Sequence, residues 1–432
     1  MQRRTLLVLV LFLLVPWAVA AEGVSAVEVT TERTLATFDL GLEELSVSPD
    51  GQNVIVIGTN GFALRFSTSD VSEEIELNSG DEDDLTDVDW HPRGETALLV
   101  GDGGTMLRYA TSDHSVTHVA GSTAYFLGQS LSSVAWDAAG GWAYVGAPDG
   151  SITRYRENAN GNGEFFTLND TKSSKIADIA CLKKMHSHCV FATQDDGMGI
   201  IDVNHEVSWL TGSEGTMWRA VICPHPARDR CYGAGQGSVV GVVELNPSVA
   251  SDSYVLVKQV NIEAEFTGFH VRTDDAILIQ TAPFGWIDWD VDDGTDGLGY
   301  AYPWIYNHDA GTSEPMIGSE GLIGGWKSTD ETGYGVTSFG RIVQYAPPAK
   351  SVDEKIVSSL AGIVLIIAVP GSVLGLMFMM SPKMQKKYID WSNSRITARN
   401  EKGRKAHDAK QRRKPHDAKQ RRKAHDARKK SK

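Results

Sequence analysis

Three segments of the chain repeat one pattern of apolar and polar positions. They read LSVSPDGQNVIVIGTNGFALRF, VDWHPRGETALLVGDGGTMLRY and VAWDAAGGWAYVGAPDGSITRY. Each predicts a short apolar strand, a polar turn, a second strand, a glycine turn and a third strand that ends in an aromatic residue. One such unit cannot bury its apolar faces alone, so copies repeated at a fixed period must stack on one another. The pattern therefore predicts a radial array of small sheets.

Seven copies align on the glycine that is expected to open the third strand, and their spacing averages in the forties, as in a four-stranded unit. These glycines are Gly61, Gly104, Gly150, Gly199, Gly237, Gly285 and Gly340. Most copies are followed by a candidate fourth, outer strand, at residues 74–77, 115–120, 164–168, 207–210 and 254–260. Copies four to six match less well, so the count is seven to within one.

The seventh copy ends at Pro347 and Pro348 without an outer strand. An unassigned strand from Val27 to Phe38, at the other end of the repeats, can supply it. Closing a ring with a strand from the opposite terminus removes an exposed sheet edge. We therefore predict an all-β domain, closed by its N-terminal strand, over residues 24–350.

This pattern resembles the WD40-like and YVTN-type seven-bladed β-propellers, although the WD40 Gly-His and terminal Trp-Asp pairs are absent. The resemblance rests on the turns at residues 48–51 (SPDG) and 91–94 (HPRG) and on the third-strand motifs Leu64-Arg65-Phe66, Leu107-Arg108-Tyr109 and Thr153-Arg154-Tyr155. It covers about three quarters of the chain. It implies a seven-bladed propeller but no particular activity, because such folds host many functions.

The two ends of the chain predict export and membrane anchoring. Residues 1–20 have a basic start, an apolar core and an AxA site, as in a signal peptide. Residues 356–380 form an uncharged run long enough to span a bilayer, and Lys383, Lys386 and Lys387 follow it. The positive-inside rule then places the repeats outside a cell membrane and residues 381–432 in the cytoplasm.

Charge divides the chain sharply. The net charge is −14 overall, yet the residues from Lys383 onward carry +15 and residues 1–382 carry −29. So acidic a domain repels nucleic acid and anionic lipid. Halophilic adaptation and an ordinary acidic secreted domain both fit this composition.

Four cysteines occur as two pairs with equal spacing, Cys181 with Cys189 and Cys223 with Cys231. In each pair the first cysteine ends a predicted first strand and the second starts the next strand, so the two face each other across an antiparallel hairpin. Export makes oxidation favourable. We predict one disulfide per hairpin. A Cys/His metal site with His186, His188 and His225 is the alternative.

An acidic hairpin, IDWDVDDGTDGLG, is the candidate metal site. Alternating carboxylates before a glycine turn resemble a calcium loop, because calcium prefers oxygen ligands. A solvated acidic hairpin without metal is the alternative, and no other cofactor is indicated. The candidate ligands are Asp288, Asp290, Asp292, Asp293 and Asp296.

The cytoplasmic tail carries a nine-residue repeat, KAHDAKQRR, KPHDAKQRR and KAHDARKKS. Its composition predicts a disordered polycation that binds anionic lipid through charge alone, with nucleic acid as the second candidate partner. The basic residues assigned to this binding are Lys405, Arg412, Arg413, Lys414, Arg421, Arg422 and Lys423.

Arg65, Arg108 and Arg154 recur at one repeat position. They could form a positive inner ring for an anion, or each could pair locally with an acidic group. The sequence contains no GxSxG, HExxH, P-loop or Asp-box motif. We therefore expect a monomeric, non-enzymatic scaffold that binds a protein or glycan. The alternatives are an assembly or quality-control factor, similar to exported propellers that help build photosystems, and an enzyme with a dispersed active site.

Overall fold

The computed structural model describes residues 26–347 and 381–405, apart from residues 79, 185–187, 261, 263, 273–275, 291–300, 306–319, 330, 384 and 403. The chain divides into two units, Met1–Pro348 and Ala349–Lys432. The predicted signal peptide and membrane-spanning segment lie outside the described residues. Among the residues that are described, none belongs to a helix long and apolar enough to cross a bilayer.

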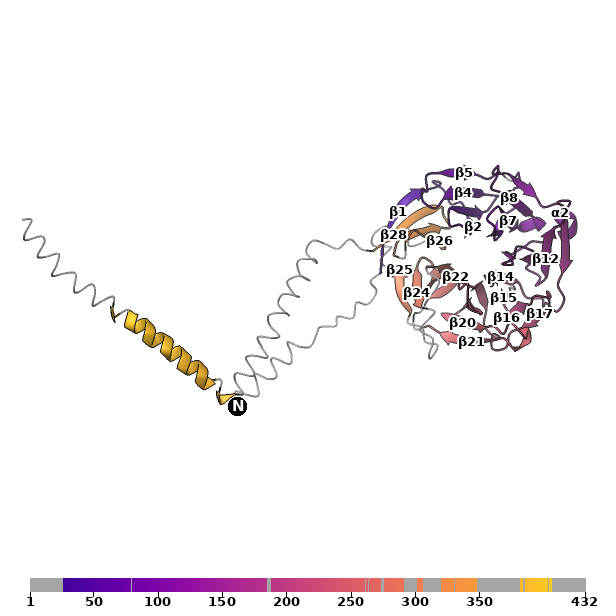
Figure 1. Ribbon diagram of the computed structural model, residues 1–432. Helices are drawn as coiled ribbons and strands as arrows, with labels where there is room; N and C mark the ends of the chain where they lie inside the picture. The colour runs from indigo at the N-terminus through magenta and orange to yellow at the C-terminus, as the bar shows by residue number, and fades with distance from the viewer. Residues whose placement is uncertain are drawn as a thin grey trace, which may run out of the picture. The chain divides into compact units, whose positions relative to one another are not determined.

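The first unit is a ring of seven four-stranded antiparallel sheets, which confirms the seven-bladed propeller (Figure 1). In each blade the strands are lettered A to D, and the A strands of neighbouring blades lie next to each other. The turns that join strands A and B lie on one side of the ring, together with those that join C and D. We call this side the AB face.

Blades 1 to 4 follow one another along the chain, each built in the order A to D. Their strands are β2 (Leu42–Val47), β3 (Asn53–Gly58), β4 (Ala63–Ser67) and β5 (Glu74–Glu76); β6 (Leu85–Trp90), β7 (Thr96–Gly101), β8 (Met106–Ala110) and β9 (Val116–His118); β10 (Ser133–Trp136), β11 (Ala143–Gly146), β12 (Ile152–Glu157) and β13 (Gly163–Thr167); and β14 (Ile176–Cys181), β15 (Cys189–Thr193), β16 (Met198–Ile201) and β17 (Val207–Trp209).

Blades 5 to 7 and three short helices complete the unit. The strands are β18 (Trp218–Ile222), β19 (Arg230–Gly235), β20 (Val239–Glu244) and β21 (Tyr254–Gln259); β22 (Glu265–Val271), β23 (Ala276–Ala282), β24 (Trp286–Asp290) and β25 (Ala301–Ile305); and β26 (Leu322–Lys327), β27 (Gly333–Thr337), β28 (Arg341–Ala346) and β1 (Glu28–Thr34). The helices are η1 (Asp102–Gly104), α2 (Ser122–Phe126) and η2 (Ala250–Asp252).

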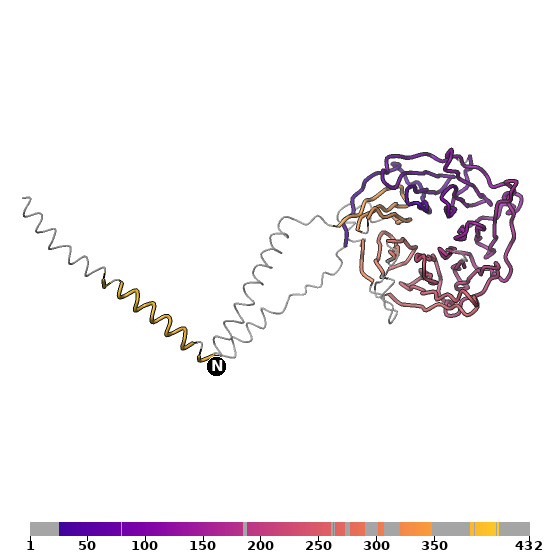
Figure 2. The backbone as a smooth tube through the Cα atoms, viewed as in Figure 1, coloured from indigo at the N-terminus to yellow at the C-terminus, as the bar shows by residue number. Residues whose placement is uncertain are grey.

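The N-terminal strand closes the ring, as the sequence predicted. β1 pairs antiparallel with β28, so that Val29 lies opposite Tyr345 and Thr34 opposite Arg341. Figures 1 and 2 show the indigo strand β1 beside the orange strands of the last blade. Arg33 of this strand also reaches blade 1, where its Nη2 lies 2.7 Å from Glu74 Oε2. The closing strand therefore fastens the last blade to the first.

The apolar core lies between blades rather than at one centre. Seven clusters of buried side chains fill the seven interfaces between neighbouring blades. Trp218 is fully buried between blades 4 and 5, and Trp286 between blades 6 and 7. Both faces of every blade are thus buried, which explains the apolar runs in the B strands, such as NVIVIG and TALLVG.

The prediction that Gly199 opens the third strand of its repeat is wrong. In blade 4 the turn before the third strand uses Gly197, whose φ is +93°, whereas Gly199 lies inside β16 between Phe191 and Trp209. A left-handed φ favours glycine at the turn. Gly199 is small for a different reason, because a Cβ there would lie 2.1 Å from the Phe191 ring. Gly197 and Gly199 have separate roles but lie two residues apart, so the sequence pattern alone does not distinguish them.

The prediction of a disordered tail is also wrong for its first part, since residues 385–402 form an α-helix. Ser381 and Pro382 precede it, a pair suited to an N-cap and first helical position, and the Gln385 N–H donates to the Ser381 carbonyl over 3.2 Å. The run between Gln385 and Lys402 contains no proline or glycine to break a helix. The nine-residue repeats beyond Lys405 lie outside the described residues.

Candidate functional site

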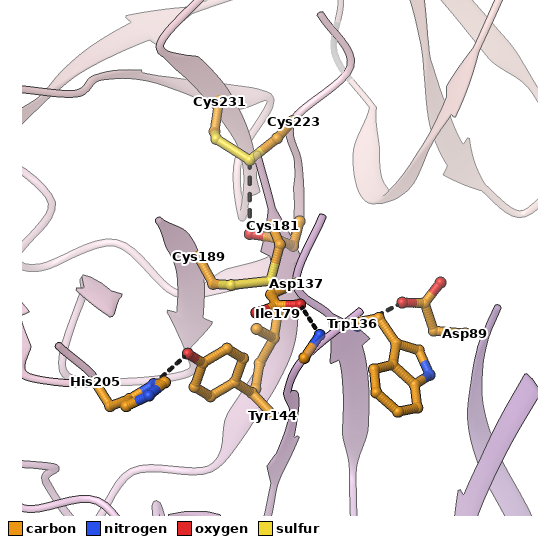
Figure 3. Close-up of a disulfide and its surroundings, with 12 residues drawn as sticks. Asp89, Trp136, Asp137, Tyr144, Ile179, Cys181, Cys189, His205, Cys223 and Cys231 are labelled. Carbon is orange, nitrogen blue, oxygen red and sulfur yellow. Dashed lines mark hydrogen bonds between the residues drawn. A yellow bond between two sulfur atoms is a disulfide. The ribbon is translucent and has the colours of Figure 1, made fainter. Parts of the chain in front are cut away.

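The two predicted disulfides are confirmed and lie on the AB face of blades 4 and 5 (Figure 3). Cys181 lies directly opposite Cys189 across the β14–β15 hairpin, with Cα atoms 3.9 Å apart. Cys223 and Cys231 are bonded likewise, with Cα atoms 4.2 Å apart. Because all four thiols are used, the Cys/His metal site is excluded.

The turns that carry these disulfides are also tied to each other. Cys223 Sγ lies 3.6 Å from the Ala180 carbonyl of the neighbouring A strand. Lys184 Nζ lies 2.7 Å from Asp229 Oδ1 and joins the two AB turns. At the AB face of blades 4 and 5, each turn is therefore closed by its own disulfide, and an ion pair joins the two turns.

Acidic residues on the A strands link neighbouring blades. Asp87 Oδ2 accepts from the Val134 N–H over 2.6 Å, and Asp89 Oδ2 accepts from the Trp136 N–H over 2.7 Å (Figure 3). Asp178 Oδ2 accepts from the Val221 N–H over 2.8 Å in the same way. The hydrogen bonds satisfy N–H groups of the next A strand that face away from its own blade.

Burial shifts the titration of these carboxyl groups. It raises the pKa of Asp87 to about 6 and that of Asp89 to about 7. Burial likewise holds the pKa of Asp178 and of Glu44 well above the usual range, with neighbouring carboxylates adding to the effect. Since neutral and charged forms both exist near neutrality, the links between blades 2 and 3 depend on pH.

A pocket of about 210 Å³ opens on the AB face between blades 2 and 3. Its walls come from the AB turn of blade 2, the AB turn of blade 3 and the C strands of both blades. The polar and aromatic residues of its lining that matter for its chemistry are His91, Arg93, Glu95, Arg108, Trp136, Tyr155 and Glu157. Pockets for drug-sized ligands are typically ~300–1,000 Å³, so this one is sized for a side chain or chain end rather than a cofactor.

His91 builds one wall of the pocket in a single protonation form. Its Nδ1 accepts from the Arg93 N–H over 3.2 Å, and its Nε2 lies 3.1 Å from the Gly140 carbonyl. A carbonyl can only accept, so Nε2 carries the proton and the ring is the neutral Nε2–H tautomer. The ring also packs edge-on against Trp136, with centroids 4.7 Å apart. Nδ1 thus bonds within the AB turn of blade 2, and Nε2 joins this turn to the AB turn of blade 3.

Two arginines give the pocket its charge. Arg108 of β8 pairs with Glu157 of β12 across the blade interface. The Arg93 guanidinium, in contrast, has no acidic partner among the described residues. The lining also contains Glu95, so two arginines and two glutamates surround the pocket, and only Arg108 and Glu157 are joined in an ion pair among the described residues.

Tyr155 supplies a hydrogen-bond donor at the pocket wall. The residue is only 2% exposed, and its hydroxyl has no hydrogen-bond partner in the part of the chain that the structure describes. Tyr109 and Tyr144 differ, because their hydroxyls bond to the Nδ1 atoms of His114 at 2.7 Å and His205 at 2.8 Å. Burial raises the pKa of Tyr155 to about 12, so the hydroxyl keeps its proton. Because the hydroxyl bonds to no described residue and Tyr155 lines the pocket, it can donate a hydrogen bond to a ligand acceptor.

The candidate calcium ligands are brought together only in part. Asp288 is buried, its Oδ2 lies 2.9 Å from Arg272 Nη2, and it accepts from the Tyr302 hydroxyl over 2.6 Å. Asp290 ends β24, and Asp292, Asp293 and Asp296 lie outside the described residues. No cluster of three metal-ligating side chains occurs in the described ranges. The calcium hypothesis stays a prediction.

The repeated arginines do not line the centre of the ring, because they lie on C strands. Arg65 bonds to Asn53, and Arg108 pairs with Glu157. The Arg154 guanidinium lies 4.7 Å from the Trp142 ring and 5.0 Å from the Phe166 ring. Of the basic tail residues, Lys405 is exposed and the other six lie outside the described residues.

Sequence reasoning missed both the pocket and the acidic links. The links had a signal in the patterns LTDVDW and IADIAC, where acidic residues alternate with apolar ones in an inner strand. The pocket had none that was specific. Its residues come from two repeats, so their proximity depends on how neighbouring blades pack.

No family model matches the chain, and none of the curated proteins matches it in sequence. Solved structures do match, and 1651 chains share the fold. One of these is the structure titled "YCF48 bound to D1 peptide", with a TM-score of 0.52, 11% identity, and coverage of 75% of this chain and 96% of that one. At such low identity the similarity shows the propeller fold alone.

Proposed function

We propose that this chain is an exported, membrane-anchored propeller that holds an extended segment of another protein while membrane complexes are assembled. The pocket between blades 2 and 3 receives one side chain or the end of that segment. In this proposal the protein binds and does not catalyse. The propeller works outside the cell membrane and the basic tail inside it.

The observation that carries the proposal is a pocket of about 210 Å³ lined by two donors, the Tyr155 hydroxyl, which bonds to no described residue, and Arg93, which forms no ion pair with a described residue. Two donors, one of them charged, suit a carbonyl or carboxylate oxygen. Leu98 and Trp136 add apolar surface for the rest of the side chain. Pockets of this make-up, with few polar groups on an apolar wall, are typical of specific recognition.

Two further observations favour an assembly factor over other scaffolds. The similar propeller YCF48 was solved with a bound D1 peptide, so this architecture accommodates a peptide ligand. The disulfides on the same face as the pocket suit an oxidising compartment, where segments of membrane proteins emerge.

Site-specific photo-crosslinking in native membranes tests the proposal. A benzophenone amino acid at Arg93 should crosslink the full chain to a membrane protein. The control position is Asp195, which is exposed in the turn between β15 and β16, on the side opposite the AB face. Equal crosslinking from both positions, or none from Arg93, would contradict a binding site at the pocket. A crosslink to a glycan-bearing fraction alone would favour the glycan-binding alternative.

A further inference from the structure

The helix of residues 385–402 exposes large apolar side chains. Tyr388 is 56% exposed, Ile389 55%, Trp391 51% and Ile396 55%. Isolated exposed apolar residues are ordinary, but four on one short helix form a surface that needs a partner.

These side chains gather on one side of the helix. At about 100° per residue, Tyr388, Ile389, Trp391 and Ile396 fall within one half of the circumference. The other half carries only polar residues, among them Lys386, Asp390, Asn393, Ser394, Thr397 and Glu401. The helix is therefore amphipathic, with a wide apolar half rather than a narrow seam for one partner helix.

The charge of the same segment is strongly positive. Residues 381–405 contain eight basic and two acidic residues, a net charge of +6. Arg395, Arg399 and Lys402 lie on the apolar half as well, and the Arg395 guanidinium is 4.5 Å from the Trp391 ring. Long arginine side chains can lay their methylenes on an apolar surface while the charged end reaches water or phosphate.

We propose that residues 385–402 lie in the surface of an anionic bilayer, with the apolar half among the acyl chains and the basic residues at the headgroups. Interfacial helices combine an aromatic and aliphatic side with lysine and arginine that reach the headgroups. Here the four large apolar residues supply that side over the first three turns, Lys386 and Lys387 lie on the other half, and the basic residues of the apolar half reach the headgroups through their long side chains. The charge selects an anionic surface over a neutral one. The tail is thereby held by apolar contact as well as by charge. This proposal does not rest on the proposed function.

Two serines on opposite halves of the helix provide a matched test. Ser392 lies on the apolar half between Tyr388 and Ile396, and Ser394 lies on the polar half. All four native cysteines are in disulfides, so Ser392→Cys or Ser394→Cys adds a single site for a nitroxide spin label. The full chain is reconstituted into vesicles of phosphatidylcholine with phosphatidylglycerol, or of phosphatidylcholine alone.

The measurement is the ratio of nitroxide accessibility to oxygen and to a water-soluble nickel chelate. In anionic vesicles we expect this ratio to be several-fold higher at position 392 than at 394. In neutral vesicles, or after Trp391→Ser with Ile396→Ser, the difference should be lost. Equal ratios at both positions in anionic vesicles would overturn the proposal. An undiminished difference in neutral vesicles would overturn the charge-selected surface and point to contact with protein.

Discussion

The interface between blades 2 and 3 and the interface between blades 4 and 5 share the same hydrogen bond between their A strands. They differ at the AB face. In both, an aspartate on one A strand accepts from an N–H of the next, as Asp87 does from Val134 and Asp178 from Val221. At the AB face, however, each AB turn of blades 4 and 5 is closed by its own disulfide, and Lys184 with Asp229 joins the two turns. Blades 2 and 3 leave a pocket there.

This difference distinguishes an interface that contributes to stability from one that is available for binding. Between blades 4 and 5 the AB face is held by an ion pair between two turns that are each closed by a disulfide. Where it is open, the inner links Asp87 and Asp89 hold the blades, and the outer groups Arg93 and Tyr155 stay available. The AB turns of the repeat thus stabilise the ring between blades 4 and 5 and form the proposed binding pocket between blades 2 and 3.

Removing the disulfides should have the largest effect on this comparison. Replacing Cys181 and Cys189 by serine should lower the free energy of unfolding by about 2–4 kcal/mol, because the unfolded chain gains freedom. Urea unfolding of the full chain, with and without reductant, measures the loss. Partner crosslinking from Arg93 should persist in folded protein, since the pocket lies two interfaces away. Equal stability with and without the bond would show that the AB turn of blade 4 needs no disulfide.

The pH dependence of stability should come next. The pKa of Asp89 in the folded protein, about 7, lies above its unfolded value, so the folded state holds a proton that the unfolded chain releases. Its contribution is fully present below about pH 4 and is lost as pH rises through about 7. The asparagine of Asp89→Asn still accepts from Trp136 through its amide oxygen but does not titrate. Between pH 5 and 8, we therefore expect the unfolding free energy of the variant to fall by about 1–2 kcal/mol less than that of wild-type.

Urea midpoints of wild-type and variant across this range measure the difference between their two curves. Asp50→Asn is a suitable control, because hydrogen bonds from Ser48 and Gln52 lower the pKa of Asp50 instead. Its curve should therefore match wild-type above pH 5. Parallel curves of urea midpoint against pH for Asp89→Asn and wild-type would contradict titration of Asp89 in this pH range.

The ion pair at the pocket should contribute least to stability. Arg108 and Glu157 are 39% and 35% exposed, so solvent screens their attraction. Glu157→Gln should change the free energy of unfolding by less than about 1 kcal/mol. By leaving Arg108 unpaired, it should also strengthen binding of an acidic ligand group. A large loss of stability would mean that the pair fastens blades 2 and 3 as Lys184 and Asp229 fasten blades 4 and 5.

The sequence predicted features that repeat within a blade or follow from local pairing. The disulfides followed from equal cysteine spacing, and the closing strand from a seventh copy that stopped at Pro347. Five outer strands were also placed correctly, including β17 and β21. These features need only the period-two alternation and the turn positions of one hairpin.

The sequence could not predict what depends on packing between blades. His91 and Gly140 are 49 residues apart, yet their contact shapes the pocket. The free hydroxyl of Tyr155 is visible only by contrast with Tyr109, which His114 caps. β25 was missed because Pro303 interrupts the alternation expected of a strand. The tail helix was not predicted, because the basic composition of the tail favours disorder. Its helix-start signal is confined to Ser381 and Pro382.

A pair of matched tyrosine variants tests the central claim that the pocket binds a protein segment. Tyr155→Phe removes the pocket hydroxyl, and Tyr109→Phe removes the one bonded to His114. Titrating the crosslinked partner's segment against the full chain, we expect Tyr155→Phe to weaken binding by about 0.5–1.5 kcal/mol with unchanged stability. Tyr109→Phe should bind as wild-type. Equal affinity for Tyr155→Phe and wild-type, with the segment still bound, would contradict recognition at this pocket.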